Sequence, residues 1–282
     1  MTVKIVTDST ADIPSELAQG LGIEVVPLKV RFGTQEFLDG VDLSSEEFYQ
    51  RLVDGPTLPT TSQPSVGEFA EVYQRLSEDS DGILSIHVSS KLSGTFNSAK
   101  QASQQEGIGC LIEVVDTLQA SMAVGLIVLA VARVANEGAG LEELTALAED
   151  TSLRSEFFVM LDTLEYLKKG GRVGPAMALI GGILSIKPMI ILRDGEVNEL
   201  AKERTRRKGV ARLIRTAQEF GSVEDMAILH STTPDEAQSL ASDLERLMPE
   251  GTQPMISRAG SVIGTYSGPG ALGVALIRSA TT

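Results

Sequence analysis

The stretch VKIVTDSTADIPSELAQGLGIEVVPLKV, residues 3–30, decides the class of fold. Val3–Val6 is an apolar run typical of a β-strand, and Asp12-Ile13-Pro14 offers a cap and a first-turn proline for a following helix. Gly22 is expected to end that helix, and Ile23–Val30 to form the next strand. The order strand, helix, strand is typical of domains built on a parallel sheet.

The same alternation continues to about residue 161. Ser44 and Ser65 each precede a glutamate by three residues, which is the capping-box spacing and predicts that two helices begin there. We therefore predict an N-terminal lobe, residues 1–161, in which a parallel sheet lies between helices. Further strands are expected at Ile83–Val88, Leu111–Val115 and Phe157–Leu161, with helices from Thr95, Ser121 and Leu141.

Beyond residue 161 the pattern changes. Asp194-Gly195, placed between the runs Met189–Leu192 and Val197, predicts a β-hairpin and hence antiparallel pairing. We therefore predict a C-terminal α+β lobe, residues 162–282, with a mixed or antiparallel sheet. Helices are expected at Lys208–Phe220 and Pro234–Leu247, and strands at Ala227–His230, Met255–Ser257 and Leu272–Ile277.

Composition narrows the possible partners. The 282 residues suggest two packed lobes, and aromatic residues are 4% with no Trp, so a large cavity would have aliphatic walls suited to an alkyl chain. The net charge of −14 disfavours nucleic acid and anionic membranes as general partners. The lone Cys110 excludes an intramolecular disulfide, and the apolar run Met122–Ala132 is too short to span a membrane. We expect a cytoplasmic protein, monomeric because no long exposed apolar stripe is evident.

Two segments place hydroxyl groups where regular structure does not require them. Thr61 and Ser62 precede Pro64 in a loop that leads into a helix, and either capping or ligand binding could explain the loop. The segment from His87 to Phe96 follows a strand and precedes a helix, where α/β sheets place their ligands. Its Ser93 and Gly94 suit an anion at a helix N-terminus, and the hydroxyls of Thr61 and Ser93 match the two oxygens of one carboxylate.

A basic group is the third feature. It comprises Lys168, Lys169 and Arg172, followed by Arg204, Arg206, Arg207 and Lys208. A charge run is commonly a solvated face, and a surface for an anionic group or acidic partner is the alternative.

Signatures of catalysis and cofactors are missing from the sequence. There is no G-x-S-x-G or Walker A motif, and the G-x-G-x-x-G at residues 268–273 lies too close to the end for a dinucleotide site. Two histidines and one cysteine cannot build a His- or Cys-rich metal site. Ser93, His87 and Asp8 are the available hydrolase trio, but their spacing does not support it. We therefore assign no catalytic residue and no cofactor.

Several motifs together resemble the DegV family of bacterial fatty-acid-binding proteins. They are Val6–Asp12, Thr61–Ser65, Ser89–Thr95, Gly170-Gly171-Arg172 and Gly268-Pro269-Gly270, which run in the family's order along essentially the whole chain, about residues 3–280. The resemblance implies a two-lobed fold that encloses a long-chain, palmitate-like fatty acid near the lobe interface. It places the carboxylate on Thr61 and Ser93, with Ser62 as a neighbour.

Some members of this family, the FakB proteins, work with a separate fatty acid kinase. The resemblance then assigns docking or phosphoryl transfer to Arg172 and, less directly, Arg204. Those members commonly carry His shortly before Gly-Pro-Gly, whereas this chain has Tyr266, which can donate a hydrogen bond but carries no positive charge at neutral pH. Our leading hypothesis is a fatty acid carrier rather than an enzyme. The alternatives are an acyl-transfer or hydrolytic enzyme using Ser93 and a regulatory adaptor that docks a kinase.

Overall fold

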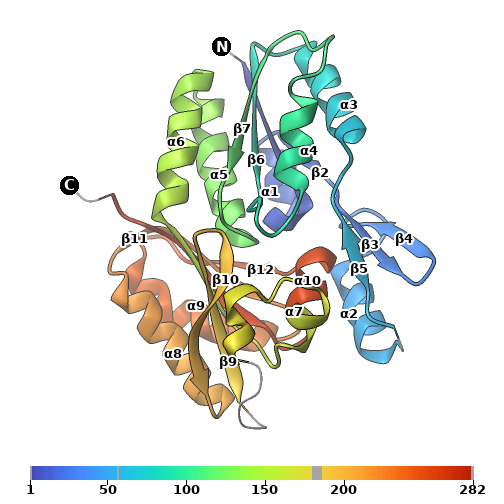
Figure 1. Cartoon of the computed structure of the whole chain (residues 1–282). Helices are drawn as coiled ribbons and strands as arrows, with labels where there is room; N and C mark the ends of the chain where they lie inside the picture. The colour runs from blue at the N-terminus through green and yellow to red at the C-terminus, as the bar shows by residue number, and fades with distance from the viewer. Residues whose placement is uncertain (1, 56, 180–185, 281–282) are drawn as a thin grey trace.

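A computed structural model describes residues 2–55, 57–179 and 186–280, and its strands form three sheets (Figure 1). The first sheet is parallel, with the order β2-β1-β6-β7. The second has the order β10-β9-β8-β13-β11-β12 and is antiparallel except for the pair β11–β12. A small antiparallel sheet has the order β4-β3-β5. The predicted α/β class, with a parallel N-terminal sheet and a mixed C-terminal one, is confirmed.

The first sheet is covered on both faces, as expected for parallel strands. Helices α3 and α4 lie on one face, whereas α5 and α6 lie on the other (Figure 1). The strands are β1 (Val3–Asp8), β2 (Ile23–Val26), β6 (Gly82–His87) and β7 (Leu111–Asp116). The helices are α1 (Ser15–Gly20), α3 (Val66–Ser77), α4 (Thr95–Ala102), α5 (Met122–Asn136) and α6 (Leu141–Arg154), with a short 3-10 turn η1 (Ser9–Ala11).

The second sheet is covered by α8 and α9 on its outer face, while its inner face points toward α5. The predicted hairpin at Asp194-Gly195 joins β9 and β10. The strands are β8 (Ser155–Met160), β9 (Lys187–Arg193), β10 (Glu196–Glu203), β11 (Val223–His230), β12 (Met255–Arg258) and β13 (Leu272–Arg278). The helices are α7 (Glu165–Lys169), α8 (Arg206–Glu219), α9 (Pro234–Leu244) and α10 (Ser261–Ser267), with 3-10 turns η2 (Gly174–Leu179) and η3 (Glu245–Leu247).

The small sheet corrects one prediction. Ile23–Val30 is not one strand: β2 ends at Val26, and the chain passes through Pro27 into a different sheet. Proline has no backbone N–H and cannot donate to a ladder, so the run is interrupted at that residue. The elements beyond it are β3 (Lys29–Phe32), β4 (Gln35–Leu38), α2 (Ser45–Asp54) and β5 (Thr60–Ser62).

The position of strand β8 corrects a second prediction. The predicted boundary at residue 161 puts Phe157–Leu161 in the N-terminal lobe, yet β8 lies inside the second sheet between β9 and β13. Its apolar residues fit the interior of either sheet equally well, so local pattern could not choose between them. The partner strands are distant in sequence, and their pairing decides where β8 belongs.

Helix α5 fills the space between the two main sheets. It packs against β1 and β6 of the first sheet and against β8, β11 and β13 of the second. Its residues from Met122 to Leu129 are all buried, which explains why this run is apolar all round rather than on one stripe.

Asp12 does not cap the first helix as predicted. Helix α1 begins at Ser15, and Asp12 has a left-handed backbone with φ of 53° and a side chain that bonds to residues outside this helix.

Candidate functional site

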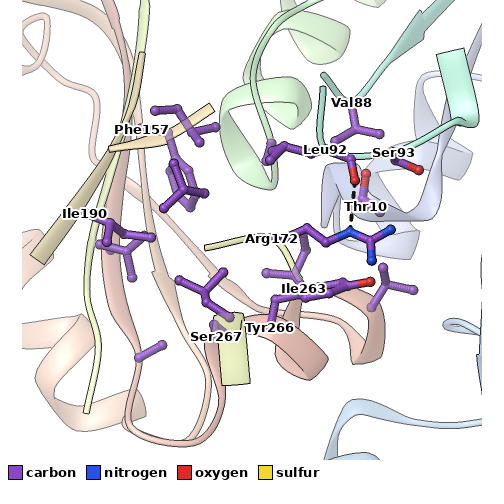
Figure 2. A pocket seen from close by; sticks show the side chains of 18 of the residues that line it. Thr10, Val88, Leu92, Ser93, Phe157, Arg172, Ile190, Ile263, Tyr266 and Ser267 are labelled. Atoms are coloured by element: carbon purple, nitrogen blue, oxygen red, sulfur yellow. Dashed lines mark hydrogen bonds between the residues drawn. The ribbon is translucent and has the colours of Figure 1, made fainter. Parts of the chain in front are cut away.

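A cavity lies between the two lobes, with about 1000 Å³ of atom-free space including its opening. Its walls come from loops of the first lobe, the inner face of the second sheet, and α10. Figure 2 shows the polar side chains of Thr10, Ser93, Arg172 and Tyr266 near one another, while Phe157 and Ile190 lie farther away among apolar neighbours. The cavity therefore has a polar end and an apolar end.

The apolar end is formed mainly by strands of the second sheet. Alternate residues of a strand point to the same face, which is why one set of side chains lines the cavity while the next packs beneath α8 and α9. Gly273 on β13 lets the Val159 side chain pack closely against its backbone, because a Cβ there would lie 2.7 Å from that side chain. The lining residues from the second sheet are Phe157, Val159, Ile190, Leu192, Val197, Leu229 and Gly273.

Two hydroxyl pairs are found at the polar end. The Oγ1 atom of Thr61 on β5 lies 2.5 Å from the Tyr266 hydroxyl oxygen on α10, and Oγ of Ser93 lies 2.8 Å from Oγ1 of Thr95. A hydroxyl group donates one hydrogen bond, so in the Thr61–Tyr266 pair one O–H remains to donate to a ligand. When Thr95 donates to Ser93, the Ser93 O–H is likewise left to donate. The structure thus brings Thr61, Ser93 and Tyr266 together around one polar end, although they are far apart in sequence.

The loop that carries Ser93 lies where β6 ends and α4 begins. Gly94 is the N-cap residue of α4. A Cβ at Gly94 would lie only 2.3 Å from Nε2 of Gln63, so glycine permits the Gln63 amide to pack against this loop. Gln63 and Thr10 both line the cavity and were missed by sequence reasoning. The motif around Thr10 was the available signal, and Asp8 holds this residue in place by accepting hydrogen bonds from its N–H and O–H groups.

Arg172 supplies positive charge among the described residues that line the cavity. Its Nε donates to the carbonyl oxygen of Leu92 (3.2 Å), and Nη1 donates to that of Gly170 (2.8 Å). Its guanidinium carbon lies 5.2 Å from the centre of the Tyr266 ring. Arg172 therefore links the second lobe to the Ser93 loop of the first lobe at the polar end of the cavity (Figure 2).

Three predicted residues lie outside the cavity lining: Ser62, Gly94 and Arg204. Ser62 is exposed on β5, where the strand alternation turns it away from its neighbour Thr61. Arg204 is exposed just after β10 and does not line the cavity either. The roles assigned to these three residues stay predictions. Arg206, two positions further, instead pairs with Glu236 and donates to the carbonyl oxygen of Gly270 (2.7 Å).

The Gly-Pro-Gly segment is a turn between α10 and β13. Gly268 and Gly270 have φ of 69° and 76°, a conformation that side chains other than glycine rarely adopt. A Cβ at either position would also press on Tyr166 or Asp162. Ser267 and Ala271 on the two sides of the turn line the cavity, so the turn is a close backbone approach to the site rather than a nucleotide loop.

The structure gives His87 a role that does not involve Ser93. Its Nδ1 lies 2.8 Å from Oδ2 of Asp8, and its Nε2 lies 2.7 Å from Oγ of Ser85. Both ring nitrogens are thus engaged inside the first lobe, and His87 is fully buried. The trio Ser93, His87 and Asp8 is therefore not assembled as a catalytic triad, which requires the base to bond to the nucleophile.

The described residues also lack two other kinds of site. They contain no group of three or more His, Cys, Asp or Glu side chains placed to hold a metal ion. No helix in these parts of the chain is long and apolar enough to cross a membrane.

Fold and site together define a two-lobed α/β protein whose cavity suits an elongated apolar molecule with an anionic or polar end. The model of the DegV family, described as "Uncharacterised protein, DegV family COG1307", matches residues 2–279. The chain belongs to the DegV family. A DegV domain-containing protein of Streptomyces coelicolor is 38% identical over 275 aligned residues, and the match covers 96% of this chain and 97% of the relative.

Solved structures of the family have the same fold. One is a DegV family protein from Thermus thermophilus whose description names fatty acid binding. It is similar to this chain with a TM-score of 0.91 and 34% sequence identity, and the match covers 99% of this chain and 100% of that one. DegV of Bacillus subtilis, described as a fatty acid binding protein, has a TM-score of 0.86 and 31% identity over 99% of this chain and 100% of its own. The match to solved structures whose descriptions name fatty acid binding therefore includes both lobes of this chain.

Proposed function

We propose that this protein is a carrier that binds one long-chain, palmitate-like fatty acid in the cavity between its lobes. The observation that carries the proposal is the polarity of the cavity: hydroxyl groups and Arg172 at one end, and aliphatic walls at the other. The Thermus and Bacillus relatives, described as binding fatty acids, support the ligand class.

The apolar end supplies most of the affinity. Burial of an alkyl chain stabilises a complex by about 0.8 kcal/mol for each CH₂ group, so a sixteen-carbon chain gains on the order of 10 kcal/mol before the costs of association. This gain is nearly the same for an acid, an alcohol or an ester of equal length. Preference for the acid must therefore come from the polar end.

At the polar end we assign the two carboxylate oxygens to the hydroxyls of Thr61 and Ser93. Each belongs to a hydroxyl pair that can leave one O–H to donate. The N-terminus of α4 at Gly94 and the guanidinium of Arg172 add positive potential near the carboxylate. Thr10, Gln63 and Tyr266 complete the polar surface, and Ser62 is a neighbour of this end.

The test replaces the two donors together. Thr61→Ala with Ser93→Ala should weaken palmitate binding by roughly 100-fold or more, because two hydrogen bonds to a charged group are lost and each is worth about 1.5–3 kcal/mol. Binding of 1-hexadecanol should change much less. Titration of delipidated protein measures both affinities, and Thr60→Ala with Ser90→Ala is a matched control. An unchanged palmitate affinity in the double variant contradicts the assignment.

We further propose that the loaded protein presents the carboxylate to a fatty acid kinase, with Arg172 at the cavity and exposed Arg204 as docking residues. Arg172 lies beside the polar end of the cavity, where a phosphoryl group would arrive. The test adds ATP and a bacterial fatty acid kinase to the palmitate-loaded protein. Formation of acyl phosphate that depends on both proteins is expected, and its absence with kinases that act on other DegV proteins contradicts this step.

A further inference from the structure

Helix α10 has its N-terminus fixed by two buried carboxyl groups. Oδ1 of Asp12 accepts a hydrogen bond from the N–H of Gly260 (2.8 Å). Oδ1 of Asp39 accepts from the N–H (2.9 Å) and the hydroxyl (2.6 Å) of Ser261. The relative exposures of Asp12 and Asp39 are 8% and 4%, so these bonds are shielded from competing water. Both carboxyl groups therefore satisfy N–H groups that a helix N-terminus leaves unpaired.

The two carboxyl groups belong to different parts of the molecule. Asp12 follows η1 in the first lobe, Asp39 follows β4 of the small sheet, and α10 precedes the last strand of the second sheet. Oδ2 of Asp12 also accepts from the Ser121 hydroxyl (2.5 Å), at the N-cap of α5. This point is therefore a junction where all three sheets are tied to one short helix.

The junction leaves α10 little freedom to move. A Cβ at Gly260 would lie 3.0 Å from Oδ1 of Asp12 and 3.3 Å from Oδ1 of Asp39. At Gly264, a Cβ would lie 2.6 Å from both Phe48 and Tyr49 of α2. Glycine at both positions lets the helix sit directly against its supports.

The other end of α10 faces the cavity. Tyr266 and Ser267 line it, and the Tyr266 hydroxyl forms the close pair with Thr61. With a rise of about 1.5 Å per residue, Tyr266 lies only about 7.5 Å along the helix from Ser261. Any shift of the N-terminus is thus carried directly to the Tyr266 hydroxyl.

We propose that Asp39, together with Asp12, is a positioning residue that fixes α10 and so holds the Tyr266–Thr61 pair where it selects a carboxylate over an alcohol end group. Neither aspartate lines the described cavity, so both act through the helix. The proposal rests on the proposed function, because it needs the carboxylate to lie at the Thr61 end.

The test measures selectivity, defined as the affinity for palmitate divided by that for 1-hexadecanol. Asp39→Ala should lower the ratio roughly tenfold, the effect of about one lost hydrogen bond to a charged group, while the alcohol affinity changes less than about twofold. Asp39→Asn should restore most of the ratio, because Asn serves nearly as well as Asp at a helix N-terminus. Asp42→Ala is the matched control, since Asp42 is exposed nearby and bonds to the N–H of Leu38 instead.

The outcomes separate the two proposals. A wild-type protein that binds neither ligand, or both equally, contradicts the proposed function itself. A selective wild type with an equally selective Asp39→Ala variant overturns only the positioning role, as does an equal loss of both affinities. If Asp39→Ala does not fold, Ser261→Ala removes one of the same bonds and should lower the ratio about two- to threefold; an unchanged ratio there overturns the proposal.

Discussion

Two hydrogen-bonded clusters, each of which contains a tyrosine and a serine, behave differently. Inside the first lobe, the Tyr73 hydroxyl donates to Oγ of Ser85, Ser85 contacts Nε2 of His87, and Nδ1 of His87 contacts Asp8. At the cavity, Thr61 pairs with Tyr266, and Ser93 with Thr95. The first cluster is fully buried, whereas Thr61, Ser93 and Tyr266 line the cavity.

The two clusters differ in whether all of their hydrogen-bond donors are already used within the cluster. With the proton of His87 on Nδ1, the buried chain runs in one direction from Tyr73 to Asp8, and every O–H and N–H in it is used. A pair of hydroxyls instead uses one of its two O–H groups and leaves the other. A tyrosine or serine is thus structural where a carboxylate acceptor closes the chain, and is available for binding where hydroxyls meet only each other.

Asp12 can be compared with Asp8, because both carboxyl groups are buried but only Asp8 contacts a histidine. Burial raises its pKa from 3.8 to about 8, opposed by the Ser121 and Gly260 hydrogen bonds and reinforced by Asp39 and Asp8. Arg258 and Tyr49 also lie at this junction. The folded protein therefore holds a proton that the unfolded chain releases above about pH 4, so this group's contribution to stability is full below that pH and falls as pH rises toward 8.

Asp12→Asn should remove this dependence. Its amide can accept from Gly260 and donate to Ser121, and Asn tolerates the left-handed backbone of this position. Between pH 5 and 7 the free energy of unfolding of the variant should fall less steeply with pH, by up to about 1.4 kcal/mol per pH unit. Urea denaturation across this range measures the slopes, with Asp42→Asn as control. Parallel slopes for variant and wild type would show that Asp12 is ionised in the folded protein.

A second test, with smaller expected effects, removes one hydroxyl group from each cluster. Tyr73→Phe should lower the free energy of unfolding by about 1–2 kcal/mol, because a buried Ser85 oxygen loses its donor, and should leave the palmitate-to-hexadecanol ratio unchanged. Tyr266→Phe should lower that ratio several-fold and change stability by less than about 1 kcal/mol. Denaturation and ligand titration of both variants give the four values. The division into structural and binding clusters fails if both variants change the same property.

The candidate site shows how far sequence reasoning reaches. The hydroxyl-rich loops around Thr61 and Ser93 stand out because they contain residues that neither helices nor strands need. Tyr266 was connected to them only by a family resemblance, and Gln63 and Thr10 were not connected at all. These side chains meet across separations of up to 205 residues, and no local pattern reports such a meeting.

What the sequence determined by itself is the set of local elements: caps such as Ser65, the hairpin at Asp194-Gly195, the buried helix after Ser121, and the parallel character of the first half. These follow from backbone preferences and from side-chain periodicity, which act between neighbours in sequence. Tertiary structure decided the sheet to which β8 belongs, the separation of β2 from β3, and the use of Asp12 as an anchor for α10 instead of a cap. The physical reason is that strand pairing and buried hydrogen bonds depend on partners from about 30 to 248 residues away, whose position is set only when the chain has folded.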